Sequence, residues 1–253
     1  VDSGYGAKTR FVYTAYNNAI LQFTGTNTYT GGTTLNAGTI SLGHANGLGT
    51  SGNITFTGGG LQYGSGITTD ISSRIKNSTG AILVDTNGNN VTFASAVGST
   101  NSGGLTKNGT GTLTLTNANT YSGGTTINVG TLNVTNSSAL GSGNVSVAAG
   151  GKLEVGANNL TIANNITLNG TTTNGAIYSN QLGAGVTTNL TGQITLNATS
   201  NVSNNWNDKT LQLSGKITGV GGLDFVLQPG QIGGRYLITG ATNDYAGATS
   251  VTG

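Results

Sequence analysis

The sequence lacks most of the residues that cross-link, kink or charge a protein. Its 253 positions hold no cysteine, no methionine and a single proline, Pro229, and charged residues make up only 6%. Without cysteine the chain forms neither disulfides nor thiolate metal sites. Backbone ladders and packing must therefore hold the fold together. The missing cysteine also fits a protein that is exported before it folds.

The few charges do not gather into a binding patch. The formal net charge is +2, and the basic residues are scattered, with Lys8/Arg10 and Arg74/Lys76 the only close pairs. Aromatic residues do not interleave with them, as they do on many nucleic-acid-binding surfaces. No apolar run approaches the roughly 18 residues that a membrane-spanning helix requires. We therefore expect no nucleic-acid partner and no membrane insertion by this segment.

Glycine and short β-rich runs dominate the chain instead. It has 45 glycines, and Val, Ile, Leu and Thr recur in short alternating runs that are typical of strands. A disordered chain would combine high net charge with few β-branched residues. Glycine also interrupts every candidate helix. The sequence therefore predicts an all-β protein.

A repeated motif organises these strands. Two long copies lie at 27–64 and 119–156, and a truncated third copy lies at 243–253. The first two copies begin with NTYTGGTTLNAGTISL and NTYSGGTTINVGTLNV. We interpret the chain as one domain, 1–253, and expect it to be a segment or a processed form of a longer chain.

Each copy places a tyrosine before a glycine turn. Tyr29, Tyr121 and Tyr245 occupy the same position in the three copies and are 92 and 124 residues apart. Both separations are too long for one turn of a solenoid, so each interval must hold several turns. The constant place of the tyrosines predicts a packing role, rather than a platform on which sugars stack.

The residues that follow the tyrosine predict a stacked core. Glycine lets the chain turn, and the Thr-Thr-Leu or Thr-Thr-Ile run then favours an extended strand. A lone strand–turn–strand unit cannot cover its apolar face, whereas stacked units can. At about 20–25 residues per coil and about 4.8 Å between coils, we expect roughly ten to twelve coils. The expected inward residues are Leu35, Ala37, Ile40 and Leu42 in the first copy and Ile127, Val129, Leu132 and Val134 in the second.

The repeats resemble a known family. YTGGTTLNAGTISLG at 29–43 and YSGGTTINVGTLNVT at 121–135 are each followed by a GLG- or ALG-type turn and a GxLxxG strand. Together they are similar to the autotransporter-associated β-strand repeat of bacterial passenger domains. The resemblance implies a right-handed parallel β-helix (β-solenoid) displayed outside the cell and linked to adhesion or surface structure. It carries over no catalytic residues.

The residues that could carry chemistry are few and isolated. His44 is the only histidine, and we expect it to be an exposed turn residue, because no second histidine or cysteine could share a metal with it. Asp70 and Asp85 lie about one coil apart and are the only conceivable carboxylate pair, yet we expect solvated turn residues or local caps. We predict no catalytic, cofactor-binding or metal residues and no enzyme. The acidic residues are Asp2, Asp70, Asp85, Glu154, Asp208, Asp224 and Asp244.

Threonine-rich runs raise one further possibility. TLTLT at 112–116 and TFT at 55–57 could belong to flat threonine rows that bind ice or a crystalline glycan. The motif does not recur at one fixed coil length, so we expect no regular array.

These observations favour an extracellular structural or adhesive β-solenoid of the bacterial surface. It would act as a rigid repeat rod in adhesion, or in matrix, biofilm or filament formation by end-to-end stacking. The third motif stops at Gly253, before the strand that should complete it, so the chain is either a piece of a longer one or stacks head to tail. The partners would be a second copy or host or bacterial surface glycans. The alternative is a glycan-binding or glycan-active β-helix of the phage-fibre or polysaccharide-lyase type.

Overall fold

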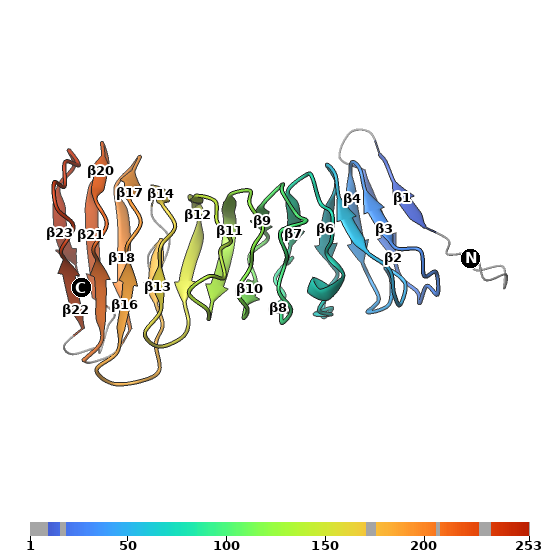
Figure 1. Cartoon of the computed structure of the whole chain (residues 1–253), viewed down its shortest axis with the longest axis horizontal. Helices are drawn as coiled ribbons and strands as arrows, with labels where there is room; N and C mark the ends of the chain where they lie inside the picture. The colour runs from blue at the N-terminus through green and yellow to red at the C-terminus, as the bar shows by residue number, and fades with distance from the viewer. Residues whose placement is uncertain (1–9, 16–18, 171–175, 206–207, 228–233, 253) are drawn as a thin grey trace.

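The computed structural model is a β-solenoid of about ten turns whose strands stack along one long axis (Figure 1). It describes residues 10–15, 19–170, 176–205, 208–227 and 234–252. Neighbouring strands run parallel from the first pair, β1 with β3, to the last, β21 with β23. The all-β parallel solenoid predicted from the repeats is therefore confirmed.

Each coil passes three sides of the solenoid in turn. Side 1 carries β1 (Phe11–Tyr13), β3 (Thr33–Leu35) and β5 (Ile54–Phe56), then β13 (Thr161–Ile162), β16 (Thr187–Leu190), β19 (Thr210–Leu213) and β22 (Arg235–Ile238). Side 2 carries β2 (Ile20–Phe23), β4 (Thr39–Leu42), β6 (Gly60–Tyr63), β7 (Ile82–Asp85), β9 (Leu105–Asn108), the first halves of β11 (Thr125–Val134) and β12 (Val145–Val155), β14 (Ile166–Asn169), β17 (Ile194–Leu196) and β20 (Ile217–Gly219). Side 3 carries β8 (Val91–Phe93), β10 (Thr112–Leu115), the second halves of β11 and β12, β15 (Ile177–Ser179), β18 (Ser200–Asn204), β21 (Leu223–Leu227) and β23 (Thr249–Thr252).

The described helix content is one short 3-10 turn, η1 (Ser72–Arg74). No helix among the described residues has the length and apolarity to cross a bilayer.

The core consists of aliphatic side chains stacked from coil to coil. On side 3, Val91 pairs with Leu113, Leu113 with Leu132, Leu132 with Leu153, and Leu153 with Ile177. All five side chains are fully buried. Each strand alternates inward and outward residues, so one stack continues through many coils and removes apolar surface from water. This stack is the stabilising feature that the repeat pattern predicted.

Two of the residues expected in the core lie outside it. Ala37 is only half-buried, and Val129 is 40% exposed. Both precede a glycine with positive φ, Gly38 at +77° and Gly130 at +72°. The ladder between β11 and β12 also shifts register between Ile127 and Val129. The extra residue of this bulge lies on β12, where Ala148 and Ala149 stand opposite Asn128. Val129 faces outward because its own strand bends at the corner, so that the inward alternation of side 2 ends at Ile127 and that of side 3 resumes at Leu132.

Buried asparagine side chains join successive coils where no strand ladder does. The Oδ1 atom of Asn119 accepts a hydrogen bond from the Val97 N–H at 2.8 Å, and its Nδ2 donates to the Ala139 carbonyl at 2.6 Å. One amide thereby satisfies backbone groups of the coil below and the coil above. This bridging explains why a protein with so few charges is rich in asparagine.

The three motif copies lie on different sides of the solenoid. In the first copy, Thr33–Leu35 lies on side 1. In the second copy, Thr125–Ile127 lies on side 2, because it pairs with β9, which stacks through β7 and β6 on β4. In the third copy, β23 lies on side 3 beside β21. Each copy is turned by one side relative to the one before, so the intervals between copies are not whole numbers of coils.

Coil length varies along the rod. Ile20 pairs with Thr39, so 19 residues complete that coil, whereas Ile166 pairs with Ile194, 28 residues later. The expected range of 20–25 residues is therefore slightly too narrow. Loops of different length absorb the difference, because only the strands must repeat at a constant spacing.

Candidate functional site

The carboxylates that sequence reasoning considered as a pair are local caps. Asp70 accepts hydrogen bonds from the backbone N–H groups of Ser72 at 2.8 Å and Ala94 at 3.0 Å. Asp85 lies at the end of β7 and accepts from the Gln62 amide at 2.9 Å. Each carboxylate is thus engaged with its own neighbours, as the prediction of local caps required.

The other described acidic side chains are also dispersed. Glu154 pairs with Lys152 at 3.2 Å, and Asp244 pairs with Lys216 at 2.7 Å. Asp224 accepts from the hydroxyl groups at the C-terminal edge, among them that of Ser250 at 3.0 Å. Over the described ranges, histidine and acidic residues never gather in a group of three that could hold a metal. Asp2 lies outside the described residues.

His44 is a turn residue, although a half-buried one. Its Nδ1 atom accepts a hydrogen bond from the Asn46 N–H at 3.1 Å, which closes the turn after β4. The ring therefore orders its own loop. The prediction of a turn histidine is confirmed, although the side chain is half-buried, with the Thr26 Oγ1 3.4 Å from its ring nitrogens.

The first two motif tyrosines make the same hydrogen bond to a threonine four residues later. The Tyr121 hydroxyl lies 2.7 Å from the Thr125 Oγ1, which donates to the Leu140 carbonyl at 3.2 Å, so the tyrosine is the donor of the first bond. Tyr29 repeats the contact with Thr33 at 2.8 Å. Burial raises the pKa of the Tyr121 phenol above its ordinary value. The side chain is therefore a neutral packing element.

Each of the first two tyrosines is covered by a glycine of the next coil. Gly49 has a φ of +68°, and a Cβ added there would lie 2.4 Å from the Tyr29 carbonyl oxygen. Gly141, with a φ of +65°, would place its Cβ 2.5 Å from the Tyr121 carbonyl oxygen. The GLG- and ALG-type turns are thus required by close backbone approach. The packing role expected for these tyrosines is confirmed.

One arginine fastens the turn above Tyr29. The Arg74 guanidinium donates to four backbone carbonyls at 2.7–3.0 Å. The acceptors are the carbonyls of Leu48, Gly49, Ser51 and Gly52. We call this arrangement the Arg74 clamp. It uses the fork of donors to satisfy a turn that has no strand partner of its own.

A buried lysine does the same at another corner. The Lys107 side chain is fully buried, and its Nζ donates to the carbonyls of Asn108 at 2.8 Å, Gly109 at 2.7 Å and Val129 at 3.1 Å. Burial lowers the pKa of this ammonium to about 8, and the nearby Asp85 opposes the shift. The group is structural, because all its described contacts are with the corner of its own and the next coil.

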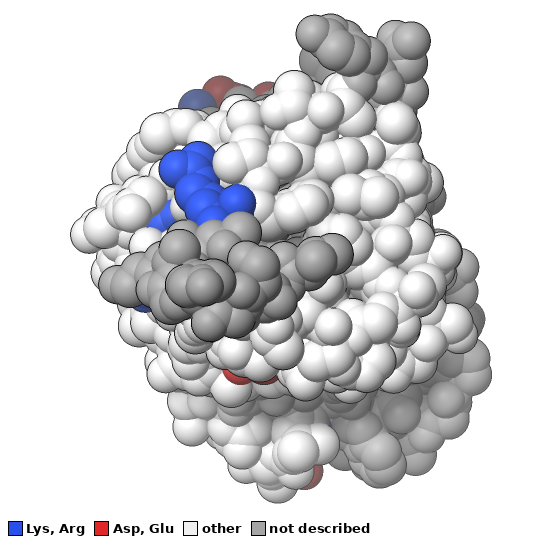
Figure 2. All heavy atoms as spheres, turned by 90° about the vertical axis from the view of Figure 1, so that its right-hand side faces the viewer, with Lys and Arg blue, Asp and Glu red and all other residues white. Residues whose placement is uncertain are grey.

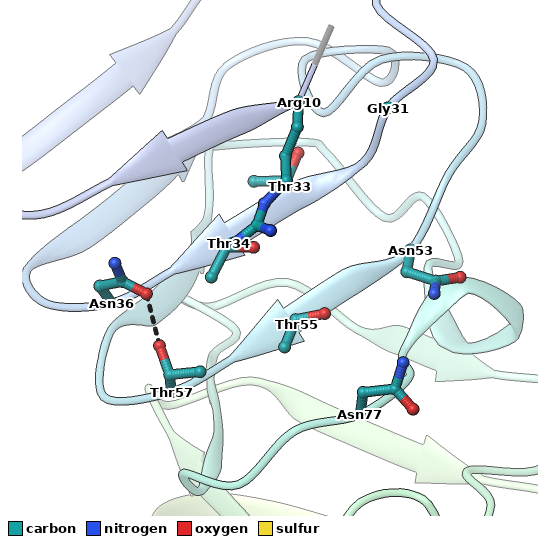
Figure 3. A pocket seen from close by; sticks show the side chains of 9 residues that line it. All are labelled: Arg10, Gly31, Thr33, Thr34, Asn36, Asn53, Thr55, Thr57 and Asn77. Carbon is teal, nitrogen blue, oxygen red and sulfur yellow. Dashed lines mark hydrogen bonds between the residues drawn. The ribbon is translucent and has the colours of Figure 1, made fainter. Parts of the chain in front are cut away.

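A polar groove crosses side 1 near the N-terminal end. It has a volume of about 370 Å³ and lies over β3 and β5 (Figure 3). Among the described residues, no acidic and no aliphatic side chain lines it. Figure 3 shows the Arg10 side chain running down across β3 toward Thr34. The groove, which we call the Arg10 groove, is lined by Arg10, Gly31, Thr33, Thr34, Asn36, Asn53, Thr55, Thr57 and Asn77.

Charge is sparse on the face that holds this end of the rod. Figure 2 views the molecule from its N-terminal end and shows one small basic patch on a surface that is otherwise almost uncharged. Arg10 is exposed and forms no salt bridge with any described residue. A single positive charge within a field of hydroxyl and amide groups is thus the main electrostatic feature of the groove.

The outward threonine row of side 3 is not regular. On the outward face of side 3, Thr92 pairs with Thr114, which pairs with Asn133, and Asn133 pairs with Glu154. The row changes from hydroxyl to amide to carboxylate within four coils. A flat hydroxyl lattice of the kind that ice or a crystalline glycan requires is therefore not present on side 3. On side 2, in contrast, hydroxyl residues follow one another in a single outward row over six coils, Thr106, Thr126, Ser146, Thr167, Thr195 and Thr218. The expectation of no regular array therefore holds on side 3 and not along this row.

Comparison with known proteins identifies the repeat. The passenger-associated-transport-repeat family matches residues 18–42 and 105–134, which include the first part of the first two motif copies. These two segments of the chain carry the autotransporter passenger repeat. It is 34% identical over 239 residues to the adhesin BmaC autotransporter of Brucella suis biovar 1 (strain 1330). That alignment covers 89% of this chain and 6% of the relative, so the passenger repeat segment spans a small fraction of the relative's length. No solved structure matches the chain.

Sequence reasoning missed the groove, the half-buried Arg74 and the buried Lys107. Arg74 was noted only as a member of a close basic pair, with Lys76. Lys107 had a signal that could have been read, because it follows Leu105 at the strand period of two and therefore points inward. Arg10 had none, since the groove joins residues of four successive coils and the coil register is needed to see it.

Proposed function

We propose that this chain is a non-enzymatic stretch of a bacterial surface passenger that acts in adhesion as a rigid rod. The observation that carries the proposal is the 34% identity, over 89% of the chain, with a protein named as an autotransporter adhesin. The fold supports it, because a continuous aliphatic stack makes a stiff, extended body and leaves every outward row for contact. The chain would be displayed outside the cell.

Surface display tests this role. The chain, fused to a translocating anchor, is placed on a non-adherent bacterium, and binding to cultured host cells is counted. Display is quantified by flow cytometry, and a β-solenoid of equal length without adhesive function is the matched control. The proposal requires binding several-fold above that control at equal display. Equal binding by the two rods would refute it.

We further propose that the rod assembles end to end. β23 is paired with β21 on one side, and Val251 on it is 66% exposed. Tyr245 is only half-buried, whereas its equivalent Tyr121 is covered by Gly141 of the next coil. A strand stacked on β23 would pair its free backbone edge and cover both side chains. The partner would be the first coil of a second copy, in an open head-to-tail contact.

Light scattering and electron microscopy of the purified chain address this second proposal. Stacking predicts filaments whose length grows with concentration and which Val251→Lys abolishes. Val12→Lys, at an exposed position on β1, tests the opposite end. Short rods of uniform length at every concentration would contradict it and would leave the adhesive role untouched.

A further inference from the structure

The Arg10 groove is a polar site whose lining side chains are held in place by neighbouring coils. Its floor is formed by outward residues of two neighbouring coils in register, Thr34 opposite Thr55. One wall is tied together by the hydrogen bond from the Thr57 Oγ1 to the Asn36 Oδ1 at 2.6 Å. These contacts fix the wall before any ligand arrives, which reduces the entropy lost on binding.

The opposite wall presents amides that are left for a ligand. The side chains of Asn53 and Asn77 point toward each other in Figure 3 and form no hydrogen bond with a described residue. Asn77 holds a φ of +59°, a left-handed conformation that costs a non-glycine residue stability and that asparagine tolerates best. The backbone thus sets the direction in which the Cβ of Asn77 leaves the chain, toward the groove.

The chemistry of the lining selects the kind of ligand. Thr hydroxyls and Asn amides both donate and accept, which suits the alternating hydroxyl groups of a sugar. The exposed guanidinium of Arg10 suits a planar carboxylate, which it binds through two parallel hydrogen bonds. The lack of an acidic lining residue leaves that charge available. The volume, about 370 Å³, is in the range of small ligand sites.

We infer that the Arg10 groove binds a carboxylate-bearing saccharide, with Arg10 on the carboxylate and the Thr and Asn groups on the hydroxyls. The inference rests on the adhesive role proposed above and gives it a ligand class. The acid could come from a sialylated glycan of a host cell or from a uronate-containing polysaccharide. The site requires the same contacts from either one.

Saturation-transfer NMR on the full chain tests the inference with three probes: 3′-sialyllactose, tri-galacturonate and neutral lactose. We expect saturation transfer to at least one acidic probe and a dissociation constant at least tenfold weaker for lactose. Arg10→Gln removes the charge and keeps a hydrogen-bonding side chain, and should weaken acidic binding at least tenfold. Asn53→Asp adds a repelling charge at the other wall and should do the same. Arg235→Gln, at an exposed arginine on β22, is the matched control and should bind as the unmodified chain.

The probes also distinguish the sources of the ligand. Preference for sialyllactose assigns the site to host glycans, and preference for tri-galacturonate assigns it to a uronate polysaccharide; both support the inference. Equal binding of lactose, acidic binding that survives both groove substitutions, or no transfer to any probe would overturn it. Circular dichroism of each variant verifies folding, and Arg10 is exposed enough that its replacement should leave the fold intact. If the displayed rod adheres equally with and without Arg10→Gln, the groove fails while adhesion stands.

Discussion

Removal of the Arg74 clamp should loosen the N-terminal coils more than any other surface substitution. In Arg74→Ala, the carbonyls of the turn above Tyr29 lose four charge-assisted hydrogen bonds at once. Hydrogen bonds to a charged group contribute about 1.5–3 kcal/mol each, and they are not additive. The side chain is half-buried and water can replace part of the loss, so we expect a total of about 2–4 kcal/mol.

The assay combines global and local readouts. For a chain of this size, about 2–4 kcal/mol corresponds to a melting temperature lowered by roughly 5–15 °C. A solenoid can also open in parts, so hydrogen exchange of residues 46–54 should accelerate more than exchange at the C-terminal coils. Arg74→Lys keeps the charge but offers a point donor in place of a fork, and it should recover about a third of the loss.

Arg235→Ala, at an exposed site on β22, is the control for a lost positive charge. If the free energy of unfolding of Arg74→Ala is within about 0.5 kcal/mol of that of this control, the clamp does not contribute to stability. If Arg74→Lys restores full stability, charge alone matters and the geometry of the fork does not. Either result would refute the reasoning.

Three further predictions test the corners of the solenoid. Gly49→Ala and Gly66→Ala both impose positive φ on alanine, but only Gly49→Ala places a Cβ against the backbone of another coil. In denaturant unfolding, Gly66→Ala should lower the free energy of unfolding by about 1–2 kcal/mol, and Gly49→Ala by about 1–3 kcal/mol more. Equal losses would contradict the close-approach argument. Tyr121→Phe deletes a buried hydrogen bond and should cost about 1 kcal/mol, whereas the half-buried Tyr245→Phe should cost much less in the same measurement. The pKa of Lys107 is about 8 in the folded protein and 10.5 in its ordinary state, so the unfolded chain binds more protons between these values. The charged ammonium of Lys107 should thus destabilise the fold fully below pH 8, and the free energy of unfolding should rise by up to roughly 3 kcal/mol as the pH increases to 10.5. If Lys107→Met shows the same pH dependence in urea unfolding, the effect does not come from Lys107.

The sequence alone was enough to predict the stacked β architecture and most of its core. Leu35, Ile40 and Leu42 are fully buried as the strand period requires. The period fails at corners: Val129 faces outward where its strand bends at Gly130, between the inward Ile127 of one side and the inward Leu132 of the next. Alternation holds within a strand and carries no information across a bulge.

The sites were less predictable because they depend on neighbours along the rod axis. Arg10, Thr34 and Asn77 line one groove only after four coils of different sequence have been laid in register. The intervals between motif copies include coils with no visible motif. Their number and length decide which residues meet, and small length differences between coils cannot be inferred from composition.

The rotation of the motif by one side per copy has a consequence for how such a rod changes over generations. Recombination between two copies of the motif would delete or duplicate one interval as a unit. Since an interval is not a whole number of coils, the junction would splice a strand of one side onto the stack of the next. Every loop beyond the junction would then change its direction around the long axis of the solenoid as well as its position along that axis. Rods that differ only in the number of motif copies would therefore present the same loops in different directions. The number of copies would then determine which loops face a common surface.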